Sequence, residues 1–219
     1  MARKGLLVCG VVASLLYVAA CVAGALRWDG YRSFSQTVSE LMAIGAPSRP
    51  VVVPLFFLYD ALVNAFAVGI WKAAGERRAL RAVAALMLAY GAVGTVGPFV
   101  PIHQRGVAAT LTDTLHIVVT GLLVLCILAM IAVGATAFGQ RFRLYSIVTI
   151  VALVACGALT GVAGPRVAAN LPTPWIGVAE RINIYGFLLW SAVLSVALLA
   201  RALARQGPVM QTRSAALAR

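Results

Sequence analysis

The chain has 219 residues, of which 62% are apolar and 11% are charged, and its mean hydropathy is +0.97. Because an average soluble domain has roughly 25% charged residues, this composition excludes a water-soluble globule, a disordered chain and a disulfide-rich secreted domain. The net charge of +12 is typical of nucleic-acid binding in a soluble protein. In a chain this apolar, the distribution of the charge matters more than its size.

Six apolar runs long enough to cross a membrane follow one another along the chain. They cover residues 5–26, 51–73, 82–100, 115–138, 144–164 and 184–203. Since each crossing needs about 20 residues, the runs use nearly the whole length. We therefore predict an all-α integral membrane protein with six transmembrane helices, forming a single domain over residues 1–219. Residues 204–219 are predicted to be a disordered tail.

The 18 Lys and Arg residues divide twelve to six between the two sides of this arrangement. The side with both termini carries Arg3, Lys4, Lys72, Arg77, Arg78, Arg81, Arg141, Arg143, Arg201, Arg205, Arg213 and Arg219. The other side carries Arg27, Arg32, Arg49, Arg105, Arg166 and Arg181. Because cytoplasmic loops hold the excess of Lys and Arg, both termini are predicted to be cytoplasmic.

The first apolar run also has features of a cleaved signal peptide, with Arg3 and Lys4 before it and a small-residue box at 18–21. The run continues to Leu26, however, and its loss would leave five spans, so we expect an uncleaved first span. The four cysteines have neither CxxC nor metal-ligand spacing, and we expect them to be packing residues. They are Cys9, Cys21, Cys126 and Cys156.

The first outer connection, residues 27–50, contains signals for a short helix. Ser33 with Gln36 fits a capping box, and Gly45 before Pro47 fits a helix stop. We predict a short interfacial helix between them, anchored to the interface by Trp28 and Tyr31 and with an apolar stripe of Val38, Leu41, Met42 and Ile44. Either this helix only caps the bundle, or it covers a site and directs Ser39 and Glu40 inward.

Asp60 is the one acidic residue within a predicted span, about 14 Å below the outer end of its helix, and Asn64 lies one turn deeper on the same face. A carboxylate at that depth is costly unless it is paired, protonated or hydrated. Tyr90, Thr120 and Thr160 are candidate partners. Asp60 either locks helices together through hydrogen bonds or belongs to a functional site.

Asp113, His116 and Thr120 share one helical face at the outer start of the fourth span, and His103 lies at the same membrane level. An acid and a histidine at this spacing can orient an imidazole, relay protons or bind a metal. Both histidines with Asp113 and Glu40 would supply four zinc ligands, although no HExxH-type motif is present. An acid and an imidazole that close a helix end are the simpler interpretation.

The last outer segment contains Glu180 and Asn183 on one face, with Arg181 at the membrane edge. Arg181 can reach lipid head groups or pair with an acid such as Glu40 or Asp113. A structural ion pair and the recognition of a lipid phosphate are both open. Two glycine sets, Gly91, Gly94 and Gly97, and Gly157, Gly161 and Gly164, favour close helix contact, with backbone approach to a ligand as the alternative.

Several segments resemble the prokaryotic membrane family known as domain of unknown function 998. They are Ser35–Leu41 followed by Gly45–Pro47, Asp113–His116, Glu180–Asn183, and Leu188–Trp190 in an aromatic-rich last span. The resemblance implies a six-helix protein of a prokaryotic plasma membrane. It also implies a loose grouping with the Frag1, DRAM and Sfk1 type membrane proteins linked to lipid handling, and it supplies no reaction.

These observations predict a multi-pass protein that binds a lipid or small molecule in a polar pocket at the outer leaflet, with transport as an extension of that role. The candidate residues are Ser39, Glu40, Asp60, Asn64, His103, Asp113, His116, Thr120, Glu180, Arg181 and Asn183. Arg181 would hold an anionic head group, while Asp113 and His116 respond to pH. The expected partners are membrane lipids and a second copy of the chain, with no nucleic acid and no cofactor.

The alternative is a metal-assisted membrane hydrolase that acts on a lipid, with His103, His116, Asp113 and Glu40 as its metal ligands. A non-enzymatic role is preferred because no catalytic motif supports this alternative. Transport would predict an inverted repeat that relates the first three spans to the last three, and the sequence shows none.

Overall fold

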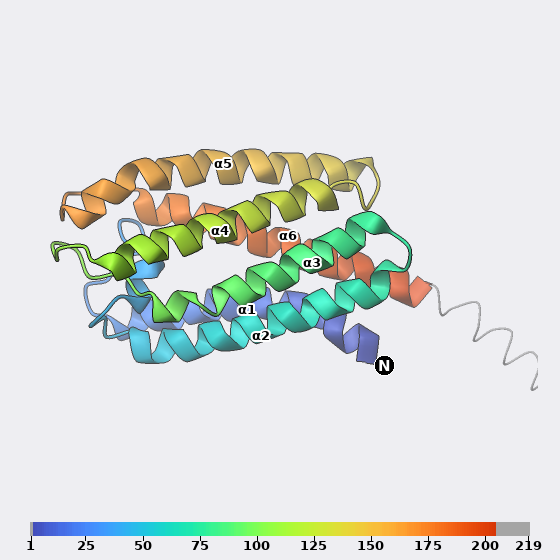
Figure 1. Cartoon of the computed structure of the whole chain (residues 1–219), viewed down its shortest axis with the longest axis horizontal. Coiled ribbons are helices and arrows are strands. Elements are labelled where there is room, and N and C mark those ends of the chain that lie inside the picture. Colours follow the sequence, from blue (N-terminus) through green and yellow to red (C-terminus); the bar gives the residue numbers. More distant parts are fainter. Residues whose placement is uncertain (1, 205–219) are drawn as a thin grey trace, which may run out of the picture.

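The computed structural model describes residues 2–204 and contains six long helices and two short 3-10 helices (Figure 1). The long helices are α1 (Ala2–Arg27), α2 (Arg49–Ala74), α3 (Arg78–Gly94), α4 (Leu111–Gly134), α5 (Gln140–Ala168) and α6 (Ile176–Ala204). The 3-10 helices are η1 (Ser39–Met42) and η2 (Gly97–Phe99). Residues 2–204 contain no strand, and six helical segments are long and apolar enough to cross a membrane. The prediction of an all-α chain with six such helices is confirmed.

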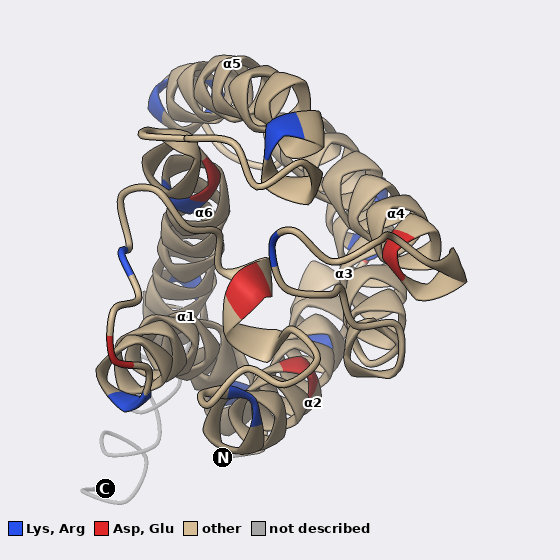
Figure 2. Ribbon diagram, turned by 90° about the vertical axis from the view of Figure 1, so that its left-hand side faces the viewer, with Lys and Arg blue, Asp and Glu red and all other residues tan. Residues whose placement is uncertain are grey.

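The six helices run alternately up and down and form a ring in which each packs on its neighbours in chain order, with α6 closing onto α1. Figure 2 shows this ring from one end. Three longer connections, residues 28–48, 95–110 and 169–175, lie at that end, which we call the loop end. The opposite end, which we call the terminal end, has Ala2, Ala204 and two short connections.

Helix is the structure that these sequences must adopt in lipid, because every backbone polar group then finds its partner within the same segment. Local sequence signals determine where the helices begin and end. Pro50 stands in the first turn of α2, where its missing N–H costs nothing, and Gly75 follows the last residue of α2 with a φ of +56°. The predicted disordered tail lies outside the described residues from residue 205 onward.

The helix boundaries differ from the predicted spans by several residues, and three of these differences have a local cause. α4 begins at Leu111 because Thr110 and Asp113 form a capping box at its start. The third span is shorter as an α-helix, since α3 ends at Gly94 and the chain continues as η2. α6 begins at Ile176, eight residues before the predicted position 184, because polar groups of the first connection bind the polar side chains of its first turns. Hydropathy alone assigns those turns to a loop.

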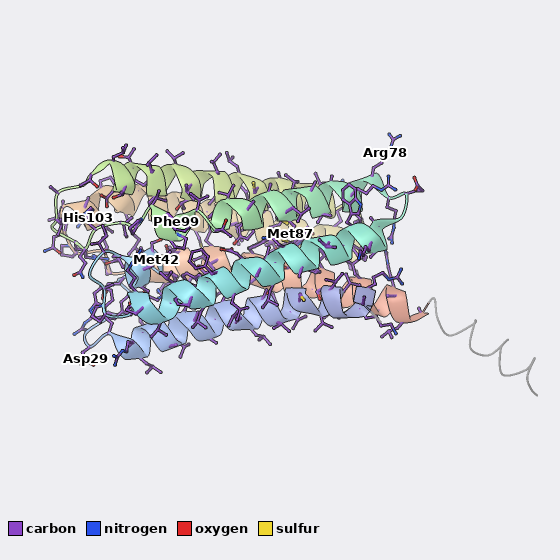
Figure 3. All side chains as sticks on the ribbon, turned by 60° about the horizontal axis from the view of Figure 1, so that its bottom comes forward. Asp29, Met42, Arg78, Met87, Phe99 and His103 are labelled. Carbon is purple, nitrogen blue, oxygen red and sulfur yellow. The ribbon has the colours of Figure 1, made fainter. Side chains whose placement is uncertain are left out.

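The main apolar core fills the terminal half of the ring. Leu7, Phe66, Met87, Trp190 and Leu194 are fully buried there, contributed by α1, α2, α3 and α6. The buried residues of α5 are Ser146, Thr149 and Leu153, all before its last 15 residues, so the loop-end half of α5 buries nothing. In Figure 3, Arg78 marks the terminal end, Met87 the core, and Met42, Phe99 and His103 the loop end.

Candidate functional site

Residues 33–48, which we call the plug, enter the mouth of the ring instead of lying flat on its surface. Glu40 of η1 is 2% exposed and Leu41 is 0% exposed. The apolar side chains of η1 pack on the loop-end halves of α1 and α2, and the Ser48 hydroxyl donates to the Leu41 carbonyl at 2.6 Å. The 3-10 helix η1 lies within the segment predicted to be helical, with Glu40, Leu41 and Met42 buried and Ser39 half-buried, and its location at the membrane interface stays a prediction. Figure 2 shows it in the middle of the ring.

Glu40 is held in a buried ion pair with Arg105. The Nε and Nη2 atoms of Arg105 lie 2.6 and 3.0 Å from the two carboxylate oxygens, and the backbone N–H of Thr37 donates to the same carboxylate at 2.7 Å. Arg105 also donates to the Thr173 hydroxyl at 2.7 Å and to the Ser35 carbonyl at 2.6 Å. One arginine therefore joins all three connections of the loop end, with Glu40 as its counter-ion.

Arg181 pairs with neither of the acids proposed for it. Its Nη1 donates to the carbonyls of Ser33 and Gln36 at 2.6 and 2.9 Å, and its Nη2 donates to the Tyr31 hydroxyl at 2.7 Å. Burial raises the pKa of Tyr31, and the protonated phenol donates to the Thr37 carbonyl at 2.7 Å. Arg181 thus fixes the plug onto α6, and its Nη1 and Nη2 atoms donate to protein groups.

His103 and Asp113 close the start of α4. Asp113 accepts from the His103 backbone N–H at 2.8 Å, its Oδ2 lies 2.8 Å from His103 Nδ1, and it accepts from the Thr110 N–H at 2.8 Å. The simpler interpretation of this pair, an acid and an imidazole that close a helix end, therefore agrees with the structure. Asp113 makes no hydrogen bond with His116 in the described chain.

His116 points inward, to the plug. Its Nδ1 lies 3.0 Å from the Val100 carbonyl oxygen and its Nε2 lies 3.2 Å from Ser39 Oγ. Because a carbonyl can only accept, Nδ1 carries a hydrogen. Ser39 Oγ is also 3.4 Å from Glu180, whose carboxylate accepts the Val38 N–H. Ser39 has one hydroxyl hydrogen, so it donates either to His116 or to Glu180, which couples the protonation of these two side chains.

A cavity of about 620 Å³ lies below this chain of hydrogen bonds, toward the middle of the ring, and all six long helices contribute to its walls. Its non-aromatic polar lining consists of Ser39, Asp60, His116, Thr120, Thr160, Glu180 and Asn183. Its aromatic lining consists of Tyr17, Phe56, Tyr59, Tyr90 and Phe187. The structure therefore brings together six of the predicted candidates: Ser39, Asp60, His116, Thr120, Glu180 and Asn183.

The other five candidates lie outside this cavity. Glu40, His103, Asp113 and Arg181 hold the loop end together as described above. Asn64 packs against α3, where a Cβ added to Gly91 would lie 2.5 Å from its Oδ1. These five residues stabilise the loop end and the α2–α3 contact. Their spacing along the sequence does not distinguish them from the residues that line the cavity.

The Asp60 carboxyl lines the cavity while being only 4% exposed. Within residues 2–204 it makes no hydrogen bond or ion pair. Of its predicted partners, Tyr90 lies hydroxyl to hydroxyl with Tyr59 at 3.0 Å, and Thr160 donates to the Cys156 carbonyl at 2.9 Å. A Cβ on Gly94 would lie 2.5 Å from Asp60 Oδ1, so the absence of a side chain there makes room for the carboxyl.

The cavity reaches the outside of the ring between α4 and α5. These two helices pack less closely than any other neighbouring pair. Ile117 and Leu125 of α4 line the cavity while being 70% and 64% exposed. A Cβ on Gly121 or Gly161 would meet nothing within 4 Å, so Gly161 does not serve close helix contact.

The four residues considered as zinc ligands are separated into different contacts. Among the described residues, no three His, Cys, Asp or Glu side chains are grouped to hold a metal ion. Glu40 is bound by Arg105, His103 by Asp113, and His116 by Val100 and Ser39. This arrangement does not favour the metal-assisted alternative.

Sequence reasoning missed Arg105 and, apart from Tyr90, the aromatic lining. Arg105 lies in a connection that contains no motif. The only available signal was that a buried Glu40 requires a cation as its partner, which does not say which arginine supplies it. The aromatic lining had a usable signal, because Phe56, Tyr59 and Asp60 have the spacing of one helical face.

The fold and the cavity define a multi-pass helical membrane protein whose ring of helices is filled at one end by a plug. The family model described as "Protein of unknown function (DUF998)" matches residues 11–197, and the chain belongs to this family. The family resemblance seen in the sequence is thereby confirmed, whereas the wider grouping with Frag1, DRAM and Sfk1 type proteins stays a prediction. Comparisons with curated proteins and with solved structures returned no match.

Proposed function

We propose that this protein binds a lipid or another amphipathic small molecule in the cavity, without converting it chemically. The observation that carries the proposal is the cavity itself: about 620 Å³, with apolar walls, a few convergent polar groups and an opening between α4 and α5. Small-molecule sites have this composition, in which apolar walls supply affinity and a few polar groups fix orientation.

The charge distribution supports an orientation with the terminal end in the cytoplasm. Of the described Lys and Arg residues, nine lie at the terminal end and six at the loop end. At the loop end, Arg49, Arg105 and Arg181 donate to backbone carbonyls of the connections. Together with the positive-inside rule, this charge difference supports a location of the cavity on the outer-leaflet side of the membrane. The family resemblance adds a prokaryotic plasma membrane as the location.

Filling the cavity tests the proposal. Gly161→Phe adds a ring where the wall of the cavity has open space, so the substitution is expected to be tolerated. Gly164→Phe is the matched control, because it lies one turn further along α5, also has no atom within 4 Å, and does not line the cavity.

The measurement is native mass spectrometry of the full-length protein, purified in a mild detergent. We expect a bound lipid or small molecule on the wild type and on Gly164→Phe, and its loss from Gly161→Phe. A wild type that carries no bound molecule, or equal occupancy of all three proteins, contradicts the proposal.

A further inference from the structure

The charged groups that line the cavity have one sign. Asp60 and Glu180 are acidic, His116 is the other titratable group apart from tyrosines, and none of the lining residues in the described chain is Lys or Arg. The nearest arginines are engaged, Arg105 with Glu40 and Arg181 with plug carbonyls. An anionic ligand would therefore find no Lys or Arg counter-charge in this cavity, and the expectation that Arg181 holds an anionic head group stays a prediction.

Three acidic side chains lie at or near the cavity, Glu40 and Asp60 buried and Glu180 half-buried, and they differ in their partners. Glu40 has Arg105, and Glu180 has the Val38 N–H and Ser39. Asp60 has no partner from residues 2–204, although it lies eleven residues into α2, about 16 Å from its start by helical rise. A carboxyl group at such depth is protonated, hydrated or paired with a counter-charge, and the protein supplies a counter-charge to Glu40 but not to Asp60.

The walls next to Asp60 are aromatic. Tyr17 stacks on Phe56 with ring centroids 4.7 Å apart, Tyr59 meets Tyr17 edge-on at 4.9 Å, and Tyr90 meets Phe187 at 5.0 Å. Aromatic faces attract cations and repel anions because of the ring quadrupole. A carboxylate among aromatic rings is thus a site for an organic cation. A small inorganic ion would leave most of the apolar walls without contact.

We infer that the ligand of the cavity is a lipophilic cation, an ammonium or similar positive group on an apolar body, with the Asp60 carboxylate as its counter-ion. This rests on the proposed function and narrows its ligand class. The opening between α4 and α5 admits the apolar body from the membrane, and the positive group reaches Asp60 beside Tyr59 and Tyr90.

The test uses two probes of the same shape and opposite charge. Tetraphenylphosphonium and tetraphenylborate each carry four phenyl rings, so a difference between them reports charge alone. Binding is measured by equilibrium dialysis on full-length protein in lipid nanodiscs, with empty nanodiscs as the blank. We expect saturable binding of tetraphenylphosphonium and none of tetraphenylborate. Equal binding of the two ions to the wild type overturns the inference without any variant.

Asp60→Asn then assigns the charge to one residue. It has the same shape, and a neutral amide is cheaper to bury than a carboxylate, so the variant is expected to fold. Tetraphenylphosphonium binding should weaken about tenfold or more. Glu76→Gln, in which an acid that is 95% exposed at the terminal end loses its charge, should bind like the wild type. Unchanged binding by Asp60→Asn contradicts the inference.

A neutral probe separates this inference from the proposed function. If N-phenyl-1-naphthylamine binds equally to wild type and Asp60→Asn and is lost in Gly161→Phe, while tetraphenylphosphonium does not bind, the cavity binds amphiphiles but the cation inference fails. If no probe binds to the wild type, both fail.

The source of the cation is read from the lipids that co-purify with the protein. An amine-bearing lipid that is present on the wild type and absent from Asp60→Asn identifies a lipid head group. Unchanged lipids together with lost tetraphenylphosphonium binding identify a free molecule. Each of these two outcomes supports the inference.

Discussion

The two halves of the ring differ in the residues that they bury and in how completely they are packed. In the terminal half, large apolar side chains such as Phe66, Trp190 and Leu194 are fully buried, and the polar Ser146 is satisfied by the Trp190 N–H at 3.0 Å. In the loop half, polar and aromatic side chains surround an open cavity, and Asp60 is left without a partner. Complete packing thus marks the half that holds the fold together, and incomplete packing marks the half that can accept a ligand.

The largest loss of stability is expected in the packed half. Trp190→Ala removes a fully buried ring and leaves the Ser146 hydroxyl without its donor, so unfolding in detergent should need about 3–5 kcal/mol less free energy. Thermal or denaturant unfolding in the absence of added ligand measures this loss of unfolding free energy. Trp175→Ala is the control, since that ring is 68% exposed and should cost far less. Equal losses would contradict the contrast between the halves.

The loop half should depend on charge instead of apolar burial. Arg105→Ala leaves Glu40 buried without its cation and should lower the free energy of unfolding by about 3–5 kcal/mol at most, with part of this loss confined to the plug. Hydrogen exchange of residues 33–48 reports the local part. Arg32→Ala, which removes an exposed arginine from the connection that contains the plug, should change neither quantity.

One substitution should have opposite signs in the two halves. At Gly134 an added Cβ would lie 2.6 Å from the Trp190 ring, so Gly134→Ala should destabilise by about 1–3 kcal/mol. At Gly161 the same Cβ meets open space in a helix, so Gly161→Ala should stabilise by about 0.5–1 kcal/mol. A destabilising Gly161→Ala would mean that the loop half is packed like the terminal half.

The two ends should also differ in access from outside the cell, without any change in stability. A cysteine in place of Val107, which is 49% exposed in a loop-end connection, should react with a membrane-impermeant maleimide applied to intact cells. A cysteine in place of Arg78 at the terminal end should react only after the cells are opened. The reverse pattern would invert the orientation, and with it the leaflet that holds the cavity.

Hydropathy was sufficient to predict the six helices because a membrane span depends on the composition of about 20 consecutive residues. The charge at Asp60 was also visible as a functional candidate, since acids within spans are rare. The partners of Glu40 and Arg181 were not predictable. Glu40 pairs with Arg105, which lies 65 positions away in the sequence. Arg181 donates to the carbonyls of Ser33 and Gln36, which lie 148 and 145 positions away. No local spacing encodes these approaches, which depend on how the connections cross at the loop end.

The contacts of Arg105 with Ser35, Glu40 and Thr173 also set an order for biogenesis. A chain that emerges from the ribosome makes Glu40 early, but the last of these partners is synthesised only after five helices have been inserted. Domains made from such distant segments cannot complete their contacts during early elongation. The mouth of the ring therefore cannot close before Thr173 has been synthesised, and a nascent chain remains open at that end until then.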